Sequence, residues 1–191
     1  MAGNEINGRV PMLEREQVTP EVGALYHAQQ QQGVVPNMFK TVAHVPDLAL
    51  GFASLLKPLL EDGALPAWYK ELVATRISVL AGSQYAVAAH SHAATQKGAT
   101  SAQIAAIKSD PQGGPFTDAE KVGLRCADRL HRSAHDIDDA FYAKLTQTFT
   151  DRQIIELIAT ATVFEFLARF VEALRIPVTP LPVERLDGKV H

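Results

Sequence analysis

The chain is organised around residues 66–98, which read PAWYKELVATRISVLAGSQYAVAAHSHAATQKG. We expect two consecutive helices here, meeting at Ala81–Gly82. On the second helix, Ser83, Ala86 and His90 follow one another at offsets of three and four residues, which puts their side chains on one face. When two helices pack side by side, such a face is where a buried polar site can form.

Glu71 lies near the start of the first helix, and His90 stands four residues after Ala86 on the second. This arrangement resembles the alkylhydroperoxidase D / carboxymuconolactone decarboxylase superfamily. The redox branch of that superfamily has a glutamate, then C-x-x-C, then a histidine four residues after the second cysteine. In this chain Ser83 and Ala86 occupy the two cysteine positions, so both thiols are absent.

The resemblance covers about residues 20–180. The runs VPNMF at 35–39 and AHVP at 43–46 resemble the N-terminal helices of the family, and FEFLARF at 164–170 resembles its last helix. Asparagine is more usual in the family at the position of Glu165. The resemblance implies an all-α, AhpD-like fold and a homo-oligomer, a trimer or a hexamer.

Composition indicates an ordinary soluble domain without a polyanionic partner. The 191 residues are 47% hydrophobic and 20% charged, with a net charge of −3 and a pI of about 6.1. We therefore expect no nucleic-acid or membrane partner. The sequence has no secretory signal pattern and no apolar run near the roughly 20 residues of a membrane span. Its single cysteine, Cys126, cannot form an intrachain disulfide, so we expect a cytoplasmic protein.

The pattern predicts one domain over 19–176, preceded by an irregular arm (1–18) and followed by an extended tail (177–191). Pro58 falls inside an apolar run and predicts a kink or break in a helix. The last helix is expected from Asp151 to about Arg175. Its apolar residues cover most of its circumference, which is typical of a helix buried against several neighbours.

Threonine-led caps predict where four helices begin. Thr19 precedes Pro20, a residue that is favoured in the first helical turn. Three further helices open with capping boxes, in which a threonine is followed three residues later by Gln or Glu. These boxes begin at Thr100, Thr117 and Thr150.

Several kinds of chemistry are disfavoured by spacing. His90 and His92 are two residues apart on a helix, so their side chains diverge and a shared metal site is not expected. A Ser83–His90 dyad is too long, because seven helical residues rise about 10.5 Å. Thiol-based peroxide reduction needs an attacking thiolate and a resolving thiol, which Ser83 and Ala86 cannot supply. We expect neither a metal nor a cofactor.

What remains is a proton-transfer pair, His90 as the general acid or base with Glu71 as its partner. In the redox branch, the resemblance implies that this pair relays protons to the cysteines. Tyr85 and Glu165 are possible pocket residues. Tyr85 points away from His90 on the helix, however, and Glu165 could instead form an i,i+4 ion pair with Arg169. Glu71 and His90 also have structural alternatives, at a helix dipole and in the core.

Three functions stay open. The first is acid–base chemistry of a lyase, decarboxylase or isomerase type on a small organic acid or carbonyl compound, using His90 and Glu71. The second is an alkylhydroperoxidase-type antioxidant protein whose cysteines at positions 83 and 86 were lost naturally or replaced deliberately. The third is an inert oligomeric binding module. The substrate is not determined by the sequence.

Overall fold

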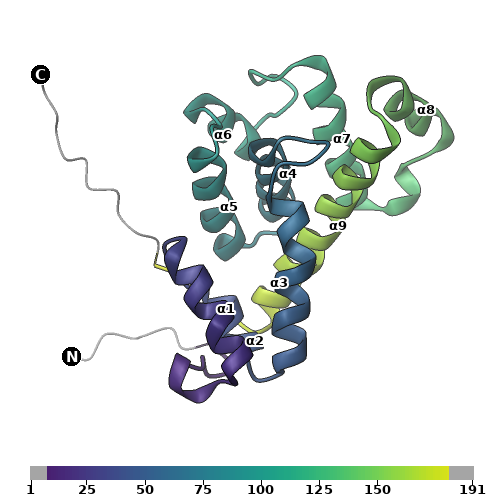
Figure 1. The fold of residues 1–191 in the computed structure, drawn as a ribbon. Coiled ribbons are helices and arrows are strands. Elements are labelled where there is room, and N and C mark those ends of the chain that lie inside the picture. Colours follow the sequence, from purple (N-terminus) through teal and green to yellow (C-terminus); the bar gives the residue numbers. More distant parts are fainter. Residues whose placement is uncertain (1–7, 181–191) are drawn as a thin grey trace, which may run out of the picture.

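Every regular element in residues 8–180, the part of the chain that the computed structural model describes, is a helix. The all-α prediction is confirmed, and Figure 1 shows α1 and α2 at one end of the molecule and α7 and α8 at the other. In chain order the elements are η1 (Arg15–Gln17), α1 (Pro20–Gln31), α2 (Asn37–Val42), α3 (Pro46–Leu60), α4 (Ala67–Leu80), α5 (Gln84–Gln96), α6 (Ser101–Lys108), α7 (Asp118–Arg132), η2 (Ala134–Asp136), α8 (Asp139–Thr148) and α9 (Asp151–Ala173).

The predicted central pair is α4 and α5, joined by a very tight turn. Gly82 adopts a left-handed backbone conformation with φ 71°, which glycine reaches without the steric cost of a Cβ atom. The Ser83 N–H donates to the Ser78 carbonyl at 2.9 Å, and the Gly82 N–H donates to Val79 at 3.1 Å. These two bonds form a Schellman motif, which satisfies the last carbonyls of α4 and reverses the chain.

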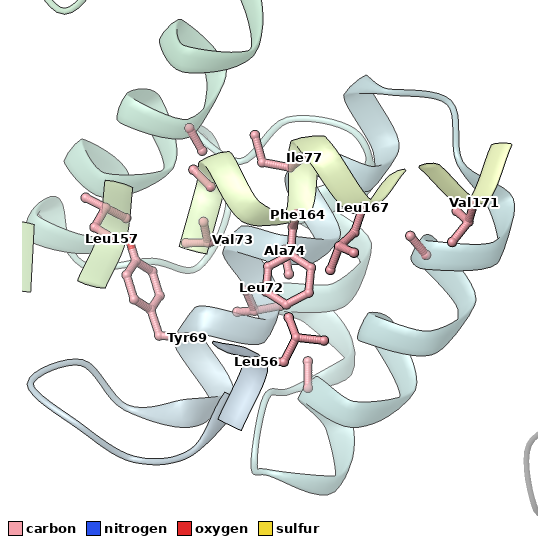
Figure 2. Packing of buried hydrophobic residues seen from close by; sticks show 14 of the residues in the cluster. Leu56, Tyr69, Leu72, Val73, Ala74, Ile77, Leu157, Phe164, Leu167 and Val171 are labelled. Atoms are coloured by element: carbon pink, nitrogen blue, oxygen red, sulfur yellow. The ribbon is translucent and has the colours of Figure 1, made fainter. Parts of the chain in front are cut away.

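Helix α4 lies at the centre of the core and packs against α3, α5, α6, α7 and α9. Its side chains Leu72, Val73 and Ile77 are completely buried. Figure 2 shows them together with Leu167 of α9 and other apolar residues from neighbouring helices. Because α4 is surrounded, any polar group on it must find its partners inside the protein.

The caps behave as the sequence predicts. Thr19 caps α1, and the boxes led by Thr100, Thr117 and Thr150 begin α6, α7 and α9. Of the kink or break predicted at Pro58, the break is wrong, since α3 continues through this residue to Leu60. Pro58 sits in the last turn of α3, where only one helical hydrogen bond is lost.

A buried lysine stabilises the end of α3. The Lys70 side chain is completely buried and donates to the Pro58 carbonyl at 2.9 Å and to Glu156 Oε2 at 3.3 Å. The Glu156 carboxylate also accepts bonds from the N–H groups of Ala64 (2.8 Å) and Leu65 (3.0 Å). Burial alone raises the pKa of Glu156, but these backbone bonds and the Lys70 charge outweigh it and lower the pKa.

Helix α9 packs against α3, α4, α5, α7 and α8. Two of its apolar side chains nevertheless face solvent in this chain, Ile155 (69% exposed) and Phe166 (49% exposed). On α3, Leu48 and Leu55 are also exposed. No helix within residues 8–180 is long and apolar enough to cross a membrane.

The predicted arm and tail are only partly visible, because residues 1–7 and 181–191 lie outside the described range. The described part of the arm contains η1 and hydrogen-bonds through Leu13 N to the Lys40 carbonyl at 2.9 Å. In the described part of the tail, the Asn37 side-chain amide donates to the Pro177 carbonyl at 3.0 Å. The Asn37 N–H donates to Thr179 Oγ1 at 2.9 Å, so the chain beyond α9 lies against the start of α2.

Glu156→Ala should lower the free energy of unfolding by about 3 kcal/mol, because the buried Lys70 ammonium loses its only carboxylate partner among the described residues. Urea denaturation at neutral pH measures the change. Glu165→Ala is the matched control, since Glu165 lies on the same helix and pairs with the exposed Arg169. It should cost at most about 1 kcal/mol. Equal losses of unfolding free energy in Glu156→Ala and Glu165→Ala would contradict the view that Glu156 compensates the buried charge of Lys70.

Candidate active site

Glu71 of α4 and His90 of α5 meet across the central helix pair. The His90 Nδ1 atom lies 2.7 Å from Glu71 Oε2, and the Glu71 side chain is 2% exposed. An ionised carboxylate can only accept, so the Nδ1–H donates and the tautomer is fixed. Nε2 is therefore the ring nitrogen that remains for a ligand, and no described residue bonds to it.

Lys97, just after the end of α5, is a third member of this cluster. Its Nζ atom lies 2.5 Å from Glu71 Oε1 and 2.7 Å from the Leu60 carbonyl oxygen. Each carboxylate oxygen of Glu71 thus has its own partner, His90 at Oε2 and Lys97 at Oε1. The sequence prediction missed Lys97, although its position seven residues after His90 places it two turns along the same helical face.

The charge state of Glu71 follows from these contacts. Burial by itself raises the pKa of a carboxyl group, and this is the largest single influence on Glu71. The hydrogen bond and charge of His90, followed by those of Lys97, more than offset it. The pKa of Glu71 therefore lies below its ordinary value of 4.5, and the group is a carboxylate at neutral pH.

His90 faces an apolar cavity of about 260 Å³ between α2, α3, α5 and α9. The imidazole packs edge-on against Phe164, with ring centroids 4.4 Å apart. Leu56, Phe164, Leu167 and Val171, four of the lining residues, are labelled in Figure 2. The cavity can hold a small molecule against the free Nε2 atom of His90.

Tyr85 and His92 both line this cavity, although they point away from His90 around the axis of α5. Both can do so because the cavity extends around a wide arc of the helix, and Tyr85 lies where the prediction of a possible pocket residue placed it. The Tyr85 hydroxyl accepts from Met38 N at 3.1 Å and lies 3.1 Å from Thr179 Oγ1. Burial raises the pKa of Tyr85, so the group is a protonated phenol that ties α5 to α2 and the tail.

Glu165 does not line the cavity, and its prediction as a pocket residue is wrong. Its Oε1 atom lies 2.8 Å from Arg169 NH2 and its Oε2 atom 2.8 Å from His131 Nδ1. The i,i+4 ion pair offered as the alternative is therefore present. Phe164 faces the cavity, and the next residue on α9 points about 100° further around the helix axis. The Glu165 side chain is therefore directed away from the cavity.

The two family cysteine positions have different surroundings. Ala86 lines the cavity, whereas Ser83 is the N-cap of α5 and accepts from Ala86 N at 3.3 Å. The Ser83 hydroxyl donates to Glu172 Oε1 on α9 at 2.7 Å. Ser83 thus bonds to Glu172 rather than to His90, in agreement with the argument against a Ser83–His90 dyad.

The single cysteine of the chain, Cys126, does not line the cavity. Cys126 is completely buried, and burial raises the pKa of its thiol to about 12, although the nearby Arg129 charge lowers it. This thiol therefore stays protonated and is a poor nucleophile. Across residues 8–180, no group of three or more His, Cys, Asp or Glu side chains could hold a metal ion.

Comparison with known proteins places this site in a family. Residues 46–129, which include Glu71, Ser83, Ala86 and His90, match the carboxymuconolactone decarboxylase family. Outside this range the likeness is one of fold, which the chain shares with AhpD-like proteins. No curated protein matches the sequence.

Solved structures of AhpD-like proteins share this fold. A peroxidase-related protein from Ralstonia eutropha JMP134, with an alkylhydroperoxidase AhpD core, is 20% identical, with a TM-score of 0.83 over 90% of this chain and 92% of its own. A peroxidase-related protein from Silicibacter sp. TM1040 has the same identity and TM-score over 94% and 95%. A variant of the debrominase Bmp8 in complex with 2,3,4-tribromopyrrole is 23% identical, with a TM-score of 0.77 over 93% of each chain.

Glu71→Gln should lower the free energy of unfolding by about 2 kcal/mol at pH 7, because Lys97 and His90 lose a buried anionic partner. Lys97 is one-third exposed and can be rehydrated, which limits the loss. The folded-state pKa of Glu71 is lowered, so its contribution is present above about pH 4.5 and is lost as the pH falls through the folded-state value.

Urea denaturation between pH 3 and 7 should therefore show that the free energies of unfolding of the wild type and Glu71→Gln become more similar as the pH falls. The matched control is Glu61→Gln, an exposed carboxylate at the end of α3. Its free energy of unfolding should stay close to that of the wild type at every pH. A difference in the free energy of unfolding between the wild type and Glu71→Gln that does not change with pH would contradict the charged state of Glu71.

Proposed function

We propose that this AhpD-like chain catalyses proton transfer on a small organic molecule held in the cavity, chemistry of the lyase, decarboxylase or isomerase type. The observation that carries the proposal is the Glu71–His90 contact at the edge of an apolar cavity. Nε2 of His90 removes a proton from the substrate and later returns it to the product. Glu71 orients the imidazole and stabilises the imidazolium formed between these steps.

The surroundings of His90 support this role. The Glu71 carboxylate is almost inaccessible to solvent, and the lining beside it is mostly apolar, which strengthens its electrostatic effect on His90. The Bmp8 complex contains tribromopyrrole, a molecule with a single ring, so a small ring compound is a reasonable size for the substrate of this chain as well. No cofactor is required for proton transfer of this kind.

Exchange of carbon-bound hydrogen with D₂O tests the proposal directly. A panel of small lactones, ketones and unsaturated acids, followed by NMR, should contain a compound whose exchange the protein accelerates. His90→Gln should lower that acceleration by about 10²- to 10⁴-fold, because a positioned base is lost.

His131→Gln is the matched control, since His131 also pairs through Nδ1 with a glutamate but lies outside the cavity. It should exchange substrate protons at the wild-type rate. Exchange that survives in His90→Gln, or that is lost equally in His131→Gln, would refute the assignment of His90 as the base.

A thiol peroxidase is the second candidate. Ser83 and Ala86 lie one helical turn apart, and the Ala86 N–H donates to the Ser83 hydroxyl, so two cysteines at these positions would be close to each other. The double variant Ser83→Cys, Ala86→Cys should reduce hydroperoxides only weakly. The Glu172 carboxylate would face the introduced thiol at position 83 and disfavour its thiolate. Adding Glu172→Gln should raise the rate by about tenfold in a dithiol-coupled assay.

Strong peroxidase activity of the double variant would favour the view that the cysteines were lost or replaced without other adaptation. Complete inactivity of the triple variant would count against the peroxidase alternative. Ser83→Ala is the control for the effect of losing the helix cap alone.

Assembly is the third part of the proposal. Exposed Leu48 and Leu55 on α3 and Ile155 and Phe166 on α9 are suited to contact with further copies of this chain, in a trimer or hexamer. A cytoplasmic location suits a chain whose only thiol is unpaired. An inert binding module would lack any dependence of proton exchange on His90.

A further inference from the structure

We infer that the cavity binds a neutral, largely apolar ring molecule that donates one hydrogen bond to Nε2 of His90, and that it rejects carboxylates. This inference rests on the proposed function, because it concerns the same site. It narrows the expected substrate, a small organic acid or a carbonyl compound, to a neutral compound, and it leaves lyase or isomerase chemistry rather than decarboxylation of a free acid.

The size and lining of the cavity set the class of ligand. An apolar cavity of about 150 Å³ is known to accept benzene, so about 260 Å³ has room for one substituted ring or two fused rings. Most of the lining is alanine, aliphatic or aromatic. The lining residues come from α2 and the segment before it, from α3, α4, α5 and α9, and from the segment beyond α9.

The polar side chains of the lining are largely occupied. Glu71 is bonded to His90 and Lys97 through its two oxygens. The Tyr85 hydroxyl and Thr179 Oγ1 bond to each other and to the backbone N–H groups of α2. Among the described lining residues this leaves the free ring nitrogen of His90 and the His92 imidazole, which lies around the other side of α5.

The charges facing His90 balance without a ligand. Glu71 contributes one negative charge from α4, and Lys97 contributes one positive charge while also bonded to Leu60 O. The lining residues of α2, α3 and α9 carry no charge. The charges of Glu71 and Lys97 therefore offset each other, and Nε2 of His90 is left for the hydrogen-bond donor of a ligand. A carboxylate would lose its hydration and find no unoccupied lysine or arginine in the lining.

Three probes of similar shape separate the possibilities: phenol, toluene and benzoate. Their binding to the full-length protein at pH 7.5 is followed by NMR shifts of the cavity residues Ala86 and Ala89 and quantified by titration. Phenol should bind about fivefold more tightly than toluene, which is the effect of one neutral hydrogen bond. Benzoate should bind at least roughly 100-fold more weakly than phenol.

The variant His90→Phe keeps a ring against Phe164 but removes the acceptor, so phenol and toluene should then bind equally. The matched control His131→Phe, which lies outside the cavity, should keep the preference for phenol. The inference is overturned if benzoate binds as tightly as phenol, if His90→Phe keeps the preference, or if none of the probes binds.

The experiment measures binding and needs no turnover. A phenol preference that depends on His90, without any His90-dependent proton exchange, would support the ligand class while the proposed catalytic role fails. Conversely, proton exchange that depends on His90 in a protein that prefers benzoate would retain the catalytic role and refute the ligand class.

Discussion

A buried carboxylate constrains the centre of this protein. Glu71 lies on the most enclosed helix and is almost inaccessible to solvent, so its charge must be compensated by the protein itself. One oxygen bonds to His90 and the other to Lys97, both supplied by α5 or the residue that follows it. This requirement sets the register of α4 against α5. The Schellman turn at Gly82 makes that register possible, because it returns the chain directly alongside α4.

The same constraint determines which chemistry the site supports. Glu71 holds the imidazole in one tautomer, which leaves a basic nitrogen toward an apolar space. Electron transfer to a peroxide would need thiols, yet Ser83 is bonded to Glu172 and the Cys126 thiol is buried and protonated. Proton transfer requires only groups that are present.

The walls of the cavity come from segments far apart in the sequence. Tyr85 of α5 receives a hydrogen bond from Met38 N at the start of α2 and lies next to Thr179 beyond α9. Asn37 bonds to the same segment through its side chain and backbone. Tyr85, a possible pocket residue on sequence grounds, thus lines the cavity and joins three of its walls.

Local chemistry encoded most of the secondary structure. Thr19 and the boxes led by Thr100, Thr117 and Thr150 begin helices as predicted, because a cap depends on residues within one turn. The spacing of Glu71 and His90, together with the family resemblance, was enough to pair them. Pro58 was misjudged because the cost of a proline depends on how near the helix end lies, and tertiary contacts set that end.

Tertiary structure alone decided the remaining contacts of the site. Lys97 binds Glu71, Ser83 binds Glu172, and Glu165 turns toward His131. Each of these contacts joins side chains on different helices, or beyond a helix end, and depends on how those helices are rotated against each other. Helical periodicity gives the direction of a side chain around its own axis, whereas the partner it meets is fixed by the packing of α4, α7 and α9 around it.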